Sequence, residues 1–324
     1  IGHHIDHAMA VLEHTNDIGK RLGIMYETNR GCMYKCVYCE WGGGTNTKVV
    51  TKDMDIIYND FEYFRQLEMA VIWITDANFG ILKRDPEIAK LIASHKDYLK
   101  FVGITGLAKS KADKRKAVLE PLMEAKLSSV YQVSLQTIDE SILKNIERTD
   151  VTPEENVELA QYLIKKYDID VIVELILGLP GMTVDTFYKE AAIEYTLLNS
   201  VKPFTHHVPL YLLPDAPVAD PAYIEKFKIK MAPISLEERE LVSTSDDTLR
   251  SVQLYKAKNY KKENTLHIPI STYSYTVEDW KEMFFMNDMN LVLMNMIMIA
   301  PFMDYLYHHK KVPLDIVFKK IFNV

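Results

Sequence analysis

The sequence predicts an α/β protein: a partial (β/α)6 TIM-like barrel with a helical C-terminal extension. Segments with strand and helix character alternate about six times between residues 24 and 218. The strand segments are almost wholly apolar, which is typical of parallel strands covered on both faces. Polar residues follow the strands, and the carboxyl ends of barrel strands are where a barrel carries its site. A doubly wound sheet satisfies the same pattern.

The expected elements follow one another along the chain. Helices are indicated by apolar residues at helical spacing or by a start such as Thr152-Pro153, a capping residue followed by proline. We expect strands, some continuing into a loop, at 24–31, 70–80, 100–108, 128–138, 170–181 and 203–217. We expect helices between them at 53–69, 85–99, 114–127, 139–148, 152–167 and 183–199.

These elements predict three parts of the chain. An N-terminal helical segment covers residues 1–23, the core barrel covers 24–220, and a mostly helical extension covers 221–324. The alternation of strands and helices ends near residue 220, where a charged and mixed stretch begins. The Met-rich stripe at 283–303 is expected to belong to the core of the extension.

The composition argues against several classes of protein. A formal net charge of −7 argues against a nucleic-acid binder with a cationic surface. No signal peptide is visible, and the most apolar stretch, 291–303, is too short to span a bilayer and contains Asn295 and Pro301. Three clustered cysteines do not form a disulfide framework. We therefore expect a protein of the cytoplasm with no membrane partner.

The cysteines of the 324-residue chain are Cys32, Cys36 and Cys39, within the string ETNRGCMYKCVYCEWGGG. Thiols spaced this closely are typical of metal ligands. A structural zinc site needs four ligands, and the fourth would come from the distant His206 or His207. A 4Fe-4S cluster usually takes four cysteines, so three would leave one iron open for a reacting ligand. Buried cysteines with no ligand role are a third interpretation.

The pattern Cys-x3-Cys-x2-Cys, with the aromatic Tyr38 before the last cysteine, resembles the signature of radical S-adenosylmethionine (SAM) enzymes. The longer string is similar, more narrowly, to radical SAM proteins of the cobalamin-binding type. So are five further segments, which read TDANFGILKRDPEIAK, SLQTIDESILKNIER, ELILGLPGMT, LPDAPVADPAYIEKF and STYSYTVEDW. The resemblance covers residues 24–285.

The resemblance implies a barrel of the radical SAM type and a reaction. Cys32, Cys36 and Cys39 then hold a 4Fe-4S cluster, and SAM binds the open iron through its amino nitrogen and carboxylate. Cleavage of SAM gives methionine and a 5′-deoxyadenosyl radical, which takes hydrogen from a substrate, with methylation as one outcome. A reductant such as flavodoxin or ferredoxin is the implied partner. Catalytic side chains and the substrate stay unassigned.

The resemblance also implies SAM contacts, at Tyr38 of the cysteine loop and at several strand ends. Asp76 and Asn78 stand where the family commonly binds the SAM amino group, with an Asx turn as the alternative. Ser134 and Gln136 resemble a ribose-contacting pair, which the alternation of strand side chains would place on one face. Arg148 would bind the SAM carboxylate, with a solvated helix end as the alternative.

Three further positions complete the predicted SAM site. Glu174 lies in an apolar strand and needs a partner, which SAM, a substrate or another side chain would supply. Gly178 opens the GLPG turn that passes adenine in the family, and Leu212 borders adenine with its backbone. We expect His206 and His207 to face solvent, with acid–base catalysis as the alternative.

The chain departs from its cobalamin-binding relatives in two respects. Those proteins usually carry an α/β domain before the barrel, but only one predicted helix precedes residue 24 here, and no Asp-x-His-x-x-Gly motif is found. Cobalamin-assisted methyl transfer and cobalamin-free hydrogen abstraction therefore stay open. Two other functions stay open as well: a non-catalytic iron–sulfur or zinc-binding barrel module, and an RNA-modifying radical SAM enzyme.

Overall fold

The computed structural model describes residues 23–41, 48–107, 111–148, 152–193, 204–234, 266–295, 300–313, 316–317 and 320. The chain forms two compact units. The first comprises Ile1–Gly31 and Lys48–Ser129, and the second comprises Cys32–Thr47 and Val130–Val324. The predicted N-terminal helix, apart from residue 23, and the Gly42–Gly44 run lie outside the described residues.

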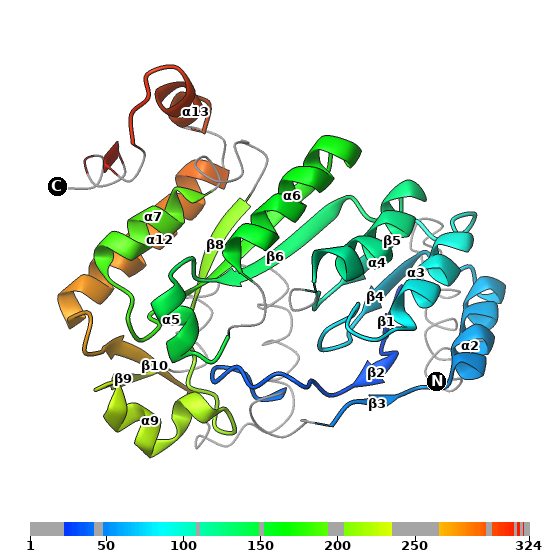
Figure 1. Cartoon of the computed structure of the whole chain (residues 1–324), viewed down its shortest axis with the longest axis horizontal. Coiled ribbons are helices and arrows are strands. Elements are labelled where there is room, and N and C mark those ends of the chain that lie inside the picture. The colour runs from blue at the N-terminus through cyan, green and yellow to red at the C-terminus, as the bar shows by residue number, and fades with distance from the viewer. Residues whose placement is uncertain are drawn as a thin grey trace, which may run out of the picture. The chain divides into compact units, whose positions relative to one another are not determined.

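The first unit is built on a parallel sheet with the strand order β1-β4-β5 (Figure 1). Its strands are β1 (Gly23–Tyr26), β4 (Val71–Ile74) and β5 (Phe101–Ile104). Its helices are α2 (Met54–Gln66), α3 (Asp85–Ser94) and α4 (Ala112–Glu124). A short antiparallel pair, β2 (Asn29–Arg30) with β3 (Val50–Thr51), follows β1 and precedes α2. The predicted alternation of strand and helix is therefore present here.

One face of this sheet is buried because α2 carries an apolar stripe. Ile57, Phe61 and Phe64 recur at helical spacing and are fully buried. The ring of Tyr26 on β1 meets the rings of Phe61 and Phe64 edge-on, with centroids 5.6 and 5.4 Å apart. This aromatic contact attaches the helix to the first strand.

The other face of the sheet presents apolar side chains to solvent. Met25, Trp73 and Gly103 stand in register across β1, β4 and β5. Met25 is 79% exposed and Trp73 is 39% exposed. A Cβ atom at Gly103 would lie 2.3 Å from the Trp73 ring, so only glycine lets the indole lie over β5.

The second unit contains another parallel sheet, with the order β6-β7-β8 (Figure 1). Its strands are β6 (Val130–Gln136), β7 (Asp170–Leu177) and β8 (Phe204–Pro209). Its connecting helices are α5 (Glu140–Asn145), α6 (Pro153–Tyr167) and α7 (Val184–Ala191). Each helix begins after a side-chain cap, Asp139, Thr152 or Thr183, that accepts a hydrogen bond from an amide of the first turn.

The remainder of the second unit holds helices and one antiparallel strand pair. The elements are η2 (Pro217–Ala219), α9 (Pro221–Lys226), β9 (Lys230–Ile234), β10 (Leu266–Ser271), α12 (Val277–Asn295) and α13 (Ala300–His308). Helix α12 packs against α7 and β8 (Figure 1). The pair β9–β10 was not anticipated, because residues 235–265 separate its strands and no hairpin turn signal joins them.

The predicted α/β class with parallel strands is confirmed. Each of the six predicted strand segments contains a parallel strand: β1, β4 and β5 in the first unit and β6, β7 and β8 in the second. Among the described helices, none has both the length and the apolar character required to cross a bilayer. The domain limits at residues 23 and 220 stay predictions.

Candidate functional site

The cysteine loop belongs to the second unit, where backbone hydrogen bonds anchor it. The Val37 amide donates to the Ile146 carbonyl at 3.2 Å, and the Val37 carbonyl accepts from the Val218 amide at 2.8 Å. The Cys39 amide donates to the Cys36 carbonyl at 3.1 Å. The backbone from Cys36 to Cys39 is therefore fixed without help from the thiols.

The three thiols have the chemistry of cluster ligands. Cys32 and Cys36 are buried, Cys39 is partly buried, and none of them forms a disulfide. Across the described residues, no group of three or more His, Cys, Asp or Glu side chains is arranged around a point that would hold a metal ion. Cysteine thiolates are the usual ligands of iron–sulfur clusters. The chemistry of the donor set therefore fits a cluster.

Arg148 connects the cysteine loop to strand β6. Its Nη1 donates to the Tyr38 hydroxyl at 2.9 Å, and its Nη2 donates to the Ser134 carbonyl at 2.5 Å. Arg148 is buried, so the solvated helix end considered for it is excluded. The Tyr38 ring packs against the apolar cluster that includes Ile146. The structure thus brings together three predicted SAM contacts: Tyr38, Ser134 and Arg148.

Glu174 finds its partners on the neighbouring strand. It stands in register with Ser134, whose Oγ donates to Glu174 Oε2 at 2.6 Å. Gln132 Nε2 donates to the other carboxylate oxygen. His206 stands in register with Glu174 on β8, and its side chain lies outside the described part. Glu174 is half-buried, so its carboxylate is paired but still partly accessible.

Gln136 does not continue the alternation of β6. The register shifts between Ser134 and Gln136. Ser134 pairs with Glu174, but Gln136, two residues further along β6, pairs with Leu175, which is only one residue further along β7. Its φ is 70°, in the left-handed region that a non-glycine side chain disfavours. The argument that places Ser134 and Gln136 on one face by simple alternation is therefore wrong, because a bulge lies between them.

The GLPG turn is covered by the segment that follows β10. Gly178 has a φ of 90°, and its carbonyl accepts a hydrogen bond from the Tyr275 hydroxyl at 2.9 Å. The Gly181 amide donates to Ser274 Oγ at 3.0 Å. Leu212 is held similarly, since its amide donates to the His267 carbonyl of β10 at 2.9 Å. Protein groups therefore occupy the Gly178 carbonyl and the Leu212 amide.

Asp76, in the first unit, is the acceptor at the centre of a buried network. Its carboxylate accepts from the Thr28 amide at 2.6 Å, from Thr28 Oγ1 at 2.5 Å, and from the amide and Nδ2 of Asn29 at 3.3 and 2.5 Å. Arg84 Nη2 donates to the Thr28 carbonyl at 2.7 Å. Burial raises the pKa of Asp76 to about 6, although the hydrogen bonds from Thr28 and Asn29 act to lower it.

Asn78 differs from Asp76 because its side chain makes no hydrogen bond to the residues that the structure describes. Its amide is buried, and among the described residues neither its Nδ2 nor its Oδ1 makes a hydrogen bond. The turn-forming role considered for Asp76 and Asn78 falls to Asp85, whose Oδ2 accepts from the Gly80 and Leu82 amides at 2.8 and 2.9 Å. Buried polar groups are almost always satisfied, so Asn78 is available to a ligand.

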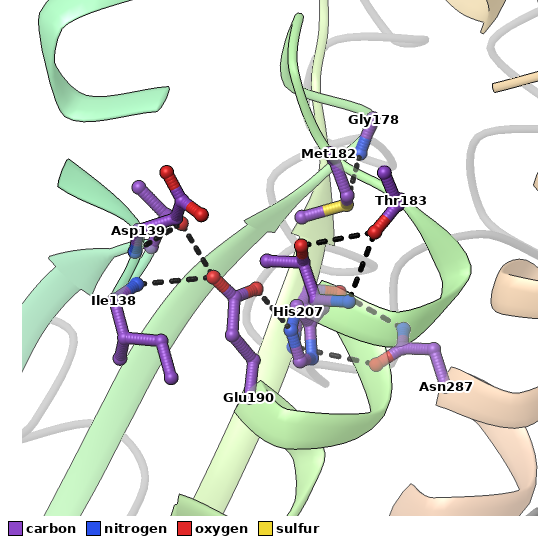
Figure 2. Close-up of polar contacts among 10 residues, drawn as sticks. Ile138, Asp139, Gly178, Met182, Thr183, Glu190, His207 and Asn287 are labelled. Atoms are coloured by element: carbon purple, nitrogen blue, oxygen red, sulfur yellow. Dashed lines mark hydrogen bonds and ion pairs between the residues drawn. The ribbon is translucent and has the colours of Figure 1, made fainter. Parts of the chain in front are cut away.

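A buried polar cluster in the second unit was missed by the sequence reasoning. Figure 2 shows Glu190 of α7 lying between Ile138 and His207, with Asn287 of α12 against His207. His207 is buried and its Nε2 lies 3.1 Å from Glu190 Oε2, so the expectation that His207 faces solvent is wrong. The Nε2 atom of His207 therefore already has a partner, the Glu190 carboxylate. The only sequence signal was a charged residue within a helix that is otherwise apolar on its sheet-facing side.

Comparison with known families identifies the chain. The family model described as the radical SAM superfamily matches residues 26–191, just over half of the 324-residue chain. The chain belongs to the radical SAM superfamily. The family predicted from the cysteine spacing is therefore confirmed.

Two curated proteins match most of this radical SAM chain. One is a 2-(S-pantetheinyl)-carbapenam-3-carboxylate methyltransferase of Streptantibioticus cattleyicolor, 28% identical over 244 residues. The other is the cobalamin-dependent radical SAM methyltransferase TokK of Streptomyces tokunonensis, 29% identical over 245 residues. Each match covers 74% of this chain and 35% of the relative. The chain thus spans about a third of the length of these relatives.

Solved structures share the fold of this radical SAM chain. The radical SAM methyltransferase TsrM of Kitasatospora setae, with tryptophan substrate and a SAM analog bound, matches with a TM-score of 0.59. The match covers 84% of this chain and 52% of TsrM, at 15% sequence identity. A likeness at this identity shows the fold, and it confirms the predicted fold of the radical SAM type.

Proposed function

We propose that this chain carries the SAM-cleaving part of a radical SAM methyltransferase. The observation that carries the proposal is the anchored loop of three thiols, whose Cys36 lies two residues from the partly buried Tyr38–Arg148 contact. The radical SAM match covers this loop, and both curated relatives are methyltransferases by name. Methyl transfer to a substrate of undefined class is therefore the proposed outcome.

Cys32, Cys36 and Cys39 would hold a 4Fe-4S cluster. When bound with SAM on its open iron, the cluster supplies the electron that cleaves SAM to methionine and a 5′-deoxyadenosyl radical. The chain fixes the loop through Val37 and buries two of the three thiols away from water. An external reductant such as flavodoxin or ferredoxin, in the cytoplasm, is part of this proposal.

The predicted SAM residues fall into two groups by their partners. Asn78 has an unpartnered buried amide, and we assign its Oδ1 to the SAM ammonium. Glu174 keeps partial exposure and remains a SAM or substrate contact. Asp76 and Arg148 are engaged by protein groups, so we assign them positioning roles: Asp76 holds Thr28 and Asn29, and Arg148 holds the Tyr38 hydroxyl.

Four further predicted contacts belong to the SAM proposal. Ser134 binds Glu174, and Gln136 occupies the bulge at the end of β6. Gly178 and Leu212 have one backbone group engaged by the segment around β10. Ribose and adenine contacts are therefore proposed for the remaining polar groups of these four residues.

Cobalamin is a separate part of the proposal. The name of one relative states that it depends on cobalamin. For this chain we propose cobalamin only as the carrier of the methyl group. Cobalamin-free hydrogen abstraction is the competing reaction. The two differ in products, because methyl transfer consumes a second SAM and releases S-adenosylhomocysteine.

The test uses the full chain reconstituted anaerobically with iron and sulfide. Dithionite and SAM are added with or without hydroxocobalamin, and nucleoside products are separated by chromatography. We expect 4Fe-4S absorbance and 5′-deoxyadenosine in both cases, with S-adenosylhomocysteine only when cobalamin is present. Cys36→Ala should lose the cluster and both products, whereas Tyr223→Phe, a control that removes only a hydroxyl bonded to the Asn145 carbonyl, should keep them. A wild-type chain with neither cluster nor SAM cleavage would refute the proposal.

A further inference from the structure

Tyr38 is placed between a fixed cation and a cysteine of the loop. Arg148 Nη1 lies 2.9 Å from the Tyr38 hydroxyl. The same guanidinium donates through Nη2 to the Ser134 carbonyl, which fixes its plane because the donors of arginine form a rigid fork. The direction of the bond to Tyr38 is thereby set by strand β6.

The hydrogen-bond chemistry of this contact leaves one proton unused. Arginine has only donors, so the Tyr38 oxygen is the acceptor, and its own O–H proton is free to be donated. The Cys36 side chain forms a hydrogen bond with the same phenol.

The backbone holds the two partners in place. Cys36 and Tyr38 flank Val37, which is buried and is hydrogen-bonded on one side to Ile146 and on the other to Val218. A chain of bonds therefore runs from the β6 carbonyl through Arg148 and Tyr38 to the sulfur of Cys36.

We propose that the Tyr38 hydroxyl, held by Arg148, donates a hydrogen bond to the Cys36 sulfur and raises the reduction potential of the cluster bound by the loop. The inference rests on the proposed function, since it concerns the cluster assigned to these thiols. Hydrogen bonds to cluster sulfurs and nearby positive charge stabilise the more negative, reduced state. Reduction by an external donor adds one electron to the cluster, while the proton stays on Tyr38.

The contact also explains why arginine stands at position 148. A buried cation beside the loop opposes the negative charge of thiolates and sulfide. Lysine at 148 would keep the charge but lose the fork that bonds Ser134 and Tyr38 together. Arg148 is therefore a positioning residue for Tyr38 as well as a fixed charge.

The experiment is an anaerobic redox titration of the reconstituted full chain, followed by the EPR signal of the reduced cluster. Tyr38→Phe should shift the midpoint to more negative potential, by about 59 mV if the reduction equilibrium changes tenfold. Arg148→Met should shift the midpoint to more negative potential at least as far as Tyr38→Phe does. When Tyr38 is already phenylalanine, Arg148→Met should shift the midpoint less than it does in the wild type, because the two residues act together. Tyr223→Phe, which removes a hydroxyl bonded to the Asn145 carbonyl, should leave the midpoint unchanged.

The outcomes separate the inference from the proposed function. A wild-type chain that takes up no 4Fe-4S cluster overturns both. A wild-type chain that cleaves SAM, with an unchanged midpoint in Tyr38→Phe at full iron content, overturns the inference alone. If Tyr38→Phe takes up no cluster, Arg148→Met decides: a more negative midpoint supports the inference and an unchanged one overturns it.

Discussion

His207 Nε2 lies 3.1 Å from Glu190 Oε2, and the structure buries both side chains completely. The other oxygen of Glu190 accepts from Thr137 Oγ1 and from the Ile138 amide at 3.0 Å. The backbone of His207 is bonded in turn to the side chain of Asn287, at 3.3 and 2.9 Å. One carboxylate thus connects α7 to β8 and to the loop that follows β6 (Figure 2).

Removing this carboxylate should destabilise the second unit strongly. Glu190→Ala leaves the Thr137 hydroxyl, the Ile138 amide and His207 without their acceptor in a buried site. We expect a loss of about 3 kcal/mol in the free energy of unfolding, measured by urea denaturation. Glu190→Gln keeps one acceptor oxygen and should lose about 1 kcal/mol.

A second carboxylate in the same region serves as the control. Glu282 of α12 accepts from the Tyr188 hydroxyl at 3.0 Å but is exposed. Glu282→Ala should therefore lower the free energy of unfolding by less than about 1 kcal/mol, as is usual for exposed contacts. This loss is roughly a third of the loss expected for Glu190→Ala, or smaller. Equal losses in unfolding free energy for Glu190→Ala and Glu282→Ala would show that the burial of Glu190 does not increase its contribution to stability.

The Asp76 network should make stability depend on pH. The folded pKa of Asp76 is about 6, above its ordinary value of 3.8, so between these values the folded chain holds a proton that the unfolded chain has released. The stabilising contribution of Asp76 is therefore complete below pH 3.8 and is lost as the pH rises through about 6. From pH 4 to 7 the wild type should lose on the order of 2 kcal/mol relative to Asp76→Asn.

Urea denaturation of both proteins at several pH values checks this expectation. The difference in unfolding free energy between wild type and Asp76→Asn should fall most steeply between the two pKa values. A difference that is constant with pH would mean that the four hydrogen bonds from Thr28 and Asn29 hold the carboxylate ionised throughout.

The contact of Gly103 with Trp73 should be sensitive to one added methyl group. In Gly103→Ala the new Cβ would lie 2.3 Å from the indole, so the ring must move off β5. We expect a loss of about 2 kcal/mol and a changed tryptophan fluorescence spectrum. In a Trp73→Ala background the same substitution should cost little. Gly23→Ala is the milder comparison, since its Cβ would lie 3.3 Å from Val71 and the neighbour need give only slightly, so it should cost less than Gly103→Ala.

Strand positions could be predicted from the sequence because the six parallel strands lie within almost wholly apolar runs bounded by polar residues. The cysteine site could be predicted because thiol spacing is local. The partners of Asp76, Arg148 and Glu190 could not, because each bond joins groups far apart in the chain. The same is true of the bulge at Gln136, where a left-handed φ of 70° breaks a period-two pattern that contains no glycine.

The GLPG turn gives the last prediction. Gly178 has a φ of 90°, and a Cβ there would lie 3.3 Å from the Tyr275 hydroxyl. Gly178→Ala therefore combines backbone strain with a close contact, and should cost about 2 kcal/mol. Tyr275→Phe loses only the hydrogen bond to the Gly178 carbonyl, so it should cost about 1 kcal/mol. In the double variant the close contact is relieved but the backbone strain stays, so thermal unfolding should show partial rescue. Full rescue would place the whole cost of Gly178→Ala in the contact with Tyr275, and no rescue would place it in the backbone.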